Sequence, residues 1–304
     1  MAIRSRGRLH ATADLSAFGA RQMPVHRAQP RVPHNEWAMS LGQLPERNQG
    51  WWWERLLVTN PWFRRGRRLF KHLPSDPRCK LCAAPFEGAA APVMRLFGKG
   101  RWPRNPKYCS SCFKNIEKHR GGAEIESSFL FADVRGSTPL AEQMSPTEFR
   151  ALMDRFFATA AKVLVEHDAI VDKFVGDEVI GIFIPGLAGE DHAAHALAAA
   201  RALMAATGNY SKDPWVPVGA GVHTGTAFVG TVGDGAHIEL TALGDPVNVA
   251  ARLASAAGAG EVLVTLTAAR AAKLGEDHLE RRDLELKGKS AATPVLVVRG
   301  LPPG

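Results

Sequence analysis

The sequence contains no run of about 18 consecutive apolar residues, so it predicts no membrane-spanning helix. Its arginine-rich N-terminus also lacks the apolar core of a secretory signal peptide. We therefore expect the protein to be cytoplasmic. Cysteine is scarce, with only 4 residues in 304. In a reducing compartment, paired cysteines favour metal binding over disulfides.

Acidic residues are scarce in the first 120 positions but not in the rest of the chain. Residues 1–120 hold 23 Lys+Arg and 7 Asp+Glu, whereas residues 121–304 hold 15 and 23. This change in the sign of the charge predicts separate segments. We expect a disordered basic segment at 1–48, a Trp/Arg segment followed by a cysteine module at 49–120, and a regular domain at 125–300.

From residue 125 onward the apolar residues follow strand and helix periods. Ser145, Pro146 and Glu148 form a capping-box pattern that predicts the start of a helix. A hairpin is expected around Gly225, and a helix with Asp245 as its N-cap. The expected strands lie at 128–134, 169–174, 178–183, 216–223, 227–232, 262–265, 279–286 and 294–299, and further helices at 190–206 and 245–256. The order strand, helix, strand, strand, helix, strand predicts an α+β fold, a ferredoxin-like sandwich with additions.

Two carboxylates stand at the ends of apolar runs. Asp133 follows the first strand, and Asp177 follows Gly176 in a hairpin that also carries Lys173. Carboxylates in such positions suit hard divalent cations, which in turn suit a triphosphate. Each residue alone has a simpler interpretation: Asp133 could cap a turn or pair with Arg135, and Asp177 could be a turn residue.

Asn248 and Arg252 are four residues apart in a predicted helix, so they share one face. An amide and a permanent cation could stabilise charge at a reacting phosphorus and orient a ribose. The alternative is an ordinary exposed helix face, which the spacing alone favours.

Four segments carry a family resemblance. Phe131–Thr138, the Lys173–Glu178 hairpin, Gly221–Gly225 and Gly244–Leu253 resemble the class III nucleotidyl cyclases, and Leu286–Lys289 matches their closing segment. The resemblance covers about residues 127–299 in the expected order. It implies the palm-type variant of the ferredoxin-like sandwich as the catalytic domain.

The resemblance implies roles for single residues. Asp133 and Asp177 match the two metal aspartates, with the Val134 carbonyl as an additional ligand of two Mg²⁺ or Mn²⁺ ions. Lys173 matches the lysine that reads the N1 edge of adenine, and Thr241 occupies the second base-reading position. Because guanylyl cyclases usually place Glu at the lysine position, Lys173 favours ATP over GTP.

Asn248 and Arg252 match the transition-state pair, and Lys287 is a weaker match to a lysine that contacts the terminal phosphates. The implied protein is an adenylate cyclase that converts ATP to 3′,5′-cyclic AMP and pyrophosphate in a head-to-tail homodimer. A diguanylate cyclase would need Gly-Gly-Asp/Glu-Glu-Phe where this chain has Val175–Val179. Two further candidate functions are those of a guanylate cyclase and of a catalytically silent regulator that binds nucleotide or nucleic acid.

Cys79 with Cys82 and Cys109 with Cys112 form two pairs, each separated by two residues, with 26 residues between the pairs. Four thiolates in this pattern fit tetrahedral Zn²⁺, and we expect a zinc-ribbon-like module. An iron–sulfur cluster and metal-free, redox-active thiols are the alternatives.

Tryptophans and arginines alternate over residues 51–73, a pattern found in nucleic-acid and anionic-membrane binding segments. We favour a structural interpretation, in which the tryptophans pack against the neighbouring domains and the arginines face solvent.

Overall fold

The computed structural model describes residues 50–73, 77–234, 237–289 and 291–300. All of them belong to one compact unit that spans Arg47–Gly304. The prediction of a disordered segment at 1–48 lies outside the described residues. In the described part of the chain, no helix combines the length and the hydropathy needed to cross a membrane.

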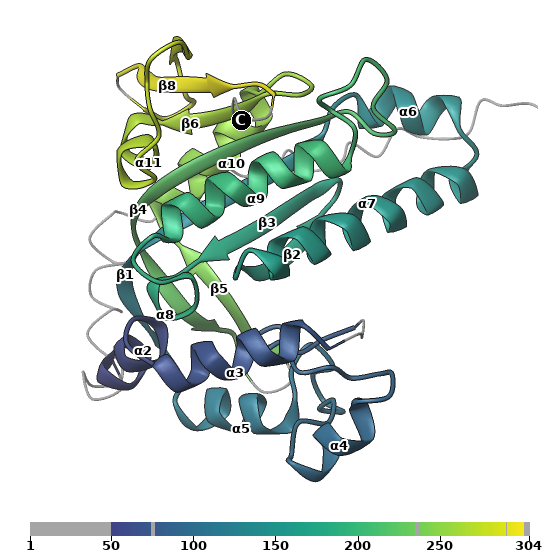
Figure 1. Ribbon diagram of the computed structural model, residues 1–304, viewed down its shortest axis with the longest axis vertical. Helices are drawn as coiled ribbons and strands as arrows, with labels where there is room; N and C mark the ends of the chain where they lie inside the picture. The colour runs from purple at the N-terminus through teal and green to yellow at the C-terminus, as the bar shows by residue number, and fades with distance from the viewer. Residues whose placement is uncertain (1–49, 74–76, 235–236, 290, 301–304) are drawn as a thin grey trace, which may run out of the picture. The chain divides into compact units, whose positions relative to one another are not determined.

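The centre of the molecule is an eight-stranded sheet with the strand order β2-β3-β1-β4-β6-β8-β7 and β5 paired with β4 (Figure 1). The strands are β1 Gly122–Val134, β2 Ile170–Val175, β3 Glu178–Phe183, β4 Val218–Val232, β5 Glu239–Leu243, β6 Val262–Thr265, β7 Glu280–Leu284 and β8 Thr293–Val298. The pairs β1–β3, β1–β4 and β2–β3 are antiparallel, and β4–β6 is parallel.

One face of the sheet is covered by α7, Pro146–Glu166, and α9, His192–Ala206 (Figure 1). The run β1-α7-β2-β3-α9-β4 with the strand order β2-β3-β1-β4 is the predicted ferredoxin-like α+β arrangement, which is therefore confirmed. The capping box is also confirmed: Ser145 Oγ accepts from the backbone N–H of Glu148, and the Glu148 carboxylate accepts from that of Ser145.

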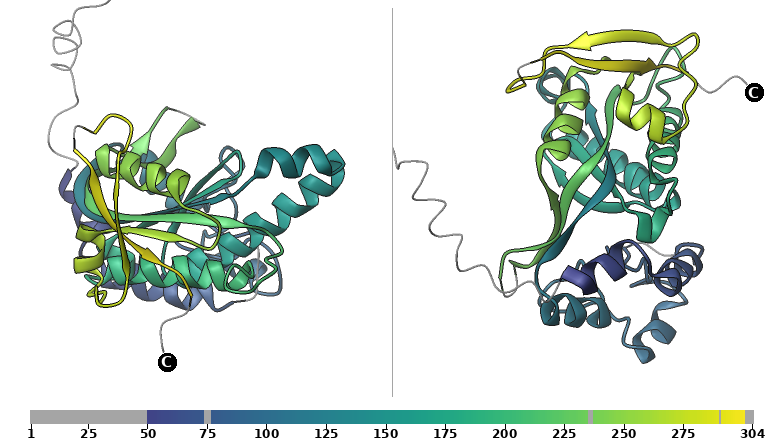
Figure 2. Two further views of the ribbon diagram at one scale, coloured as in Figure 1. Left: turned by 90° about the horizontal axis from the view of Figure 1, so that it is seen from above. Right: turned by 90° about the vertical axis from the view of Figure 1, so that its left-hand side faces the viewer.

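The opposite face carries α10, Asp245–Ala256, and the N-terminal helices, which lie at one end of the sheet (Figure 2). These helices are α2 Gly50–Leu57, α3 Pro61–Lys71, α4 Ala91–Leu96 and α5 Ser110–Lys118. Trp53 and Tyr108 share one buried apolar cluster with Phe129, Phe131 and Ile182 of the sheet. The N-terminal helices are therefore part of the same core as the strands beside them. The remaining short helices are α6 Ser137–Gln143, α8 Pro185–Ala188 and α11 Leu266–Ala271.

The predicted hairpin around Gly225 is wrong. Residues 218–232 form the single strand β4, which pairs with β1 from Val218 to Gly230 without a break at Gly225. A Cβ on Gly225 would lie 2.9 Å from Pro246 Cγ, so this glycine allows α10 to approach the strand and does not mark a turn. The returning strand is β5. Asp245 is also not an N-cap, because it is the first helical residue and Gly244 precedes it with φ 137°.

Candidate active site and cysteine cluster

Asp133 and Asp177 lie at the same edge of the sheet. Asp133 pairs with Glu178 at the end of β1, and the Val134 N–H donates to the Asp177 carbonyl at 3.4 Å. Gly176, with φ 63°, forms the tight turn between β2 and β3 that presents Asp177. The backbone thus places both predicted metal aspartates and Val134 beside one another.

Arg135 lies among these carboxylates. Its Nη2 donates to Asp133 Oδ2, so the simpler interpretation of Asp133, an ion pair with Arg135, is also present in the structure. The Asp133 side chain nevertheless keeps 20% of its surface exposed. Burial and the negative charge of Asp177 raise the pKa of Glu178 to about 7, although Arg135 opposes this shift. Three carboxylates, those of Asp133, Asp177 and Glu178, thus lie at this edge near the guanidinium of Arg135, as expected where cations bind.

The structure also brings Lys173 and Thr241 together. Lys173 Nζ donates to Thr241 Oγ1 at 3.4 Å, which joins β2 to β5 across 68 residues of sequence. Thr241 is buried, and its hydroxyl donates to Asp172 Oδ2 at 2.8 Å. Lys173 Nζ lies 3.6 Å from the same carboxylate, with 43% of the side chain exposed. Lys173 therefore faces Thr241 and Asp172, although the hairpin alone places it near Asp177.

Asn248 and Arg252 lie on α10, where Asn248 is exposed and Arg252 is half-buried. A Cβ on Gly288 would lie 3.5 Å from Arg252 Nη2, so the loop that contains Lys287 passes beside this guanidinium. Leu286 anchors the loop by packing into the buried cluster that contains Leu253. Within the described residues, no hydrogen bond or ion pair joins Asp133 or Asp177 to Lys173, Thr241, Asn248 or Arg252. Arg135 does reach α10, because its Nη1 donates to the Ser255 carbonyl at 3.0 Å near the C-terminal end of that helix.

The four cysteines form a buried cluster. Their sulfur atoms all lie within 4.8 Å of one another, and all four are free thiols. Cys82 Sγ and Cys109 Sγ are 3.7 Å apart. Bonds of about 2.3 Å to one tetrahedral ion would place two sulfurs about 3.8 Å apart. The spatial clustering predicted from the two pairs is confirmed, and the donor set fits zinc.

Backbone groups support this cluster. The N–H of Cys109 donates to Cys79 Sγ at 3.2 Å, and the N–H of Cys112 donates to Cys109 Sγ at 3.4 Å at the start of α5. Both sulfurs thus already accept hydrogen bonds that stabilise a thiolate.

Lys80 is a residue whose position the sequence does not predict. It stands between Cys79 and Cys82, yet its Nζ lies 3.0 Å from Asp172 Oδ1, 2.8 Å from Glu239 Oε1 and 2.6 Å from the Leu240 carbonyl. The side chain is only 6% exposed. No local pattern could have revealed these contacts, because 92 residues separate Lys80 from Asp172.

A cavity of about 620 Å³ opens beside Lys173. Its wall combines β2 with residues of the cysteine module and the two residues just before Cys79. The lining residues include Lys80, Arg101, Lys107, Asp172, Lys173 and Phe174. The space next to the predicted base-reading lysine is thus partly enclosed by the N-terminal part of the chain.

The tryptophans divide into packed and exposed residues. Trp53 is fully buried and its Nε1 donates to the His119 carbonyl at 2.8 Å, while Trp52 stacks on the His119 ring with centroids 4.4 Å apart. Trp51 and Trp62 are exposed. The expected packing therefore holds for Trp52 and Trp53 only.

One arginine contradicts the expectation of a solvated face. Arg67 is buried, and it donates through Nη1 to the Leu81 carbonyl at 2.6 Å and through Nη2 to the Ala169 carbonyl. It therefore joins the cysteine module to the sheet.

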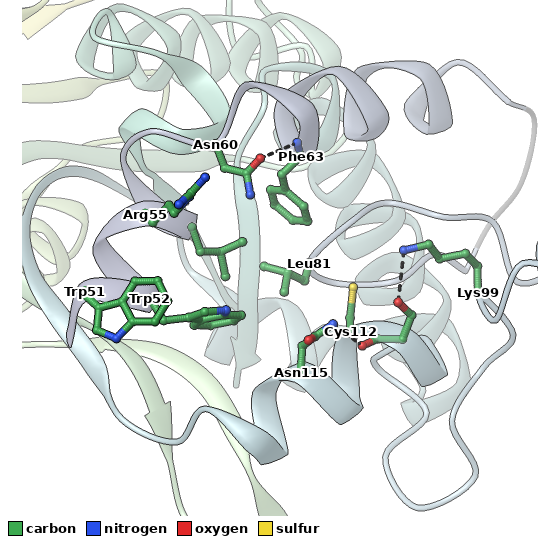
Figure 3. A pocket seen from close by; sticks show the side chains of 11 residues that line it. Trp51, Trp52, Arg55, Asn60, Phe63, Leu81, Lys99, Cys112 and Asn115 are labelled. Atoms are coloured by element: carbon green, nitrogen blue, oxygen red, sulfur yellow. Dashed lines mark hydrogen bonds between the residues drawn. The ribbon is translucent and has the colours of Figure 1, made fainter. Parts of the chain in front are cut away.

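A second cavity, of about 410 Å³, lies between α2 and the cysteine cluster (Figure 3). Trp51 and Trp52 line one side, and Cys112 and Lys99 line the other. Lys99 Nζ donates to Ser111 Oγ at 3.5 Å.

Comparison with known proteins identifies the family to which the sheet domain is similar. The family model for the adenylate and guanylate cyclase catalytic domain matches residues 124–298. An adenylate cyclase of Anabaena cylindrica is 30% identical over 187 residues, which cover 57% of this chain and 36% of the relative. The chain thus matches about a third of that relative's length.

Two solved structures share the fold. The guanylyl cyclase Cya2 has 25% identity and a TM-score of 0.54, with 60% of this chain and 96% of that chain covered. The adenylyl cyclase CyaB from P. aeruginosa has 26% identity and a TM-score of 0.51, with 59% and 96% covered. The similar structures include both purine specificities, so similarity alone does not choose between ATP and GTP.

Proposed function

Since the chain belongs to the family of adenylate and guanylate cyclase catalytic domains, we propose that it is an adenylate cyclase that converts ATP to 3′,5′-cyclic AMP and pyrophosphate. The observation that carries this choice of substrate is the contact between Lys173 and Thr241, with the Thr241 hydroxyl donating to Asp172.

This contact fixes what each group offers to a base. A carboxylate only accepts, so Thr241 must use its single proton on Asp172 and present lone pairs elsewhere. Lys173 only donates. Adenine offers an acceptor at N1 and a donor at its 6-amino group, which complements this pair. Guanine reverses both, since it has N1–H and an acceptor oxygen at position 6, and the pair therefore supports ATP over GTP.

Asp133, Asp177 and the Val134 carbonyl are the residues that would hold two Mg²⁺ or Mn²⁺ ions. Such ions neutralise the triphosphate and lower the pKa of the attacking ribose hydroxyl. The gathering of the Asp133, Asp177 and Glu178 carboxylates at this edge supports cation binding there. Arg135 competes for Oδ2 of Asp133, so the ion pair would weaken ion binding through that oxygen.

Asn248 and Arg252 complete the chemistry on the exposed face of α10. Asn248 orients the ribose, and Arg252 keeps a permanent positive charge for the phosphorus centre as the bond to pyrophosphate breaks. Lys287, in the loop beside Arg252, contacts the terminal phosphates.

We place the complete site between two protomers in a head-to-tail homodimer. The acidic edge of one protomer would face Lys173, Thr241 and α10 of its partner, giving two equivalent sites. Within the described residues of one chain, neither Asp133 nor Asp177 has a hydrogen bond or ion pair to Lys173, Thr241, Asn248 or Arg252, which supports this arrangement. The four cysteines would hold a structural Zn²⁺ that stabilises the N-terminal module, with an iron–sulfur cluster as the alternative.

The test is incubation of the purified full-length chain with ATP or GTP and Mg²⁺ or Mn²⁺, followed by chromatography of the products. We expect cyclic AMP as the main product and none from Asp133→Ala. Asp154→Ala is the matched control, because this exposed carboxylate on α7 pairs with Arg150 one turn away. Absence of any cyclic nucleotide, or a preference for GTP, would contradict the proposal.

A further inference from the structure

We propose that Lys80, between the first two cysteines, is a positioning residue that sets the purine preference of the active site. It acts through Asp172, whose carboxylate orients the Thr241 hydroxyl. This inference rests on the proposed function, because it concerns how the same site distinguishes adenine from guanine.

Lys80 is fixed at both ends. An ammonium group has three N–H donors, and three oxygens surround Nζ, those of Asp172, Glu239 and Leu240. The backbone N–H of Lys80 donates to the Lys107 carbonyl at 2.8 Å. The module therefore holds the main chain while the sheet holds the charged end.

Asp172 uses its two oxygens in opposite directions. Oδ1 accepts from Lys80 at 3.0 Å, and Oδ2 accepts from Thr241 at 2.8 Å. Its side chain is 3% exposed, and a buried carboxylate is stable only with a partner of opposite charge. Lys80 supplies that charge and is itself buried. Lys173 is therefore not needed to neutralise Asp172, and its half-exposed ammonium group stays available to the base.

Without Lys80, Lys173 becomes the closest cation to Asp172, only 3.6 Å away in the structure. Lys173 is then drawn toward the carboxylate and away from the base. This movement reduces the preference for adenine.

The cysteine module also contacts β5 and the residue just before it. Tyr108 Oη accepts from the Leu240 N–H at 2.9 Å, and Asn105 Nδ2 donates to the Ile238 carbonyl at 2.9 Å. Tyr108 precedes Cys109 as Lys80 follows Cys79. The strand that carries Thr241 is thus positioned by residues adjacent to two of the four thiols.

The experiment compares Lys80→Met with Lys107→Met in steady-state assays with ATP and GTP. Lys107 contacts the same Glu239 at 3.0 Å, but its side chain is 55% exposed. For Lys80→Met we expect the ATP:GTP ratio of kcat/KM to fall about tenfold, mainly through a higher KM for ATP. The reason is that Lys173 and Thr241 would no longer be held in the arrangement that complements adenine. Lys80→Arg should restore part of the ratio, and Lys107→Met should change it by less than about twofold.

A second readout separates base recognition from general damage. Pyrophosphate carries no base, so its inhibition constant should be the same in wild type and Lys80→Met. An equal loss of pyrophosphate inhibition and ATP affinity, or an unchanged ATP:GTP ratio in a folded variant, would overturn the inference. Failure of the wild type to form any cyclic nucleotide would instead remove the proposed function and this inference with it.

Asp172→Asn tests the same link if Lys80→Met does not fold. Because Lys80 only donates, the amide oxygen must face it, and the amide NH₂ then donates to Thr241. The Thr241 proton must then point toward the base, where it suits the 6-oxygen of guanine. We expect the preference to shift toward GTP, and an unchanged or higher ATP preference would contradict the proposal.

Discussion

The two faces of the central sheet differ in the kinds of residue that are buried against them. The face under α7 and α9 is apolar, with Phe156 and Leu164 in its core and a small neutral network of Ser128, Thr224 and His192. The face under the N-terminal module contains buried charges as well, including Lys80, Asp172 and Arg67. Charged contacts thus concentrate on the face that carries the predicted base-reading residues. The face under α7 and α9 is thus packed mainly through apolar contacts. The opposite face combines apolar packing with charged contacts beside the predicted base-reading residues.

The largest effect is expected from Cys82→Ser, which removes one of four clustered sulfurs. The cysteine module should lose the proposed Zn²⁺, and with it the support of Lys80 and Tyr108, because metal-binding energy is folding energy in such modules. We expect loss of zinc by mass spectrometry, a lower melting temperature and a lower ATP:GTP ratio. Full zinc content in the variant would contradict the assignment of the cluster.

Phe156→Ala tests the apolar face. This side chain is fully buried, and its removal should lower the free energy of unfolding by about 3–5 kcal/mol. Chemical denaturation measures this change. Because the variant leaves the polar face intact, the ATP:GTP ratio of the folded fraction should equal that of wild type, and a changed ratio would contradict the contrast between the faces.

Arg67→Met tests the connection between the module and the sheet. The buried guanidinium donates to the Leu81 and Ala169 carbonyls, which would lose their donors. We expect the free energy of unfolding to fall by about 2–3 kcal/mol. The exposed Arg65, which lies over the Trp62 ring, provides the control, because Arg65→Met should have little effect.

The smallest effect concerns His223, on the same face as Phe129, with which it pairs. Burial lowers the pKa of His223 to about 4. The unfolded chain takes up this proton near its ordinary pKa of about 6.5, so the free energy of unfolding should decrease as the pH falls from about 6.5 to 4. His223→Asn should remove this part of the pH dependence in denaturation series, and an unchanged profile would count against it.

Helix starts and turns could be predicted from the sequence wherever a short residue pattern determines the backbone conformation. The Ser145–Glu148 capping box marked the start of α7, and Gly176 marked the turn that presents Asp177. The same reasoning failed at Gly225, where the glycine accommodates Pro246 from a distant helix. A turn glycine and a packing glycine look alike in sequence, and only the tertiary contact distinguishes them.

The site shows the same division. Asp133, Lys173 and Arg252 stood out through family motifs, and the proximity of Lys173 to Thr241 agrees with their assignment as a pair. Lys80 carried no such signal, because nothing near it in sequence predicts a buried charge between two cysteines. The role proposed for Lys80 depends on its contact with Asp172, 92 residues later in the sequence. Residues that act through others are recognised only when the folded neighbourhood is known.

The apolar cluster that joins Trp53 and Tyr108 to Phe129 and Ile182 has a consequence for the modularity of the protein. A chain truncated to begin at residue 124, where the family match starts, would expose those strand residues to water as an apolar patch prone to aggregation. The segment matched by the family model therefore could not be fused alone to a different N-terminal domain without replacing those apolar residues. The N-terminal helices and the sheet form one structural unit.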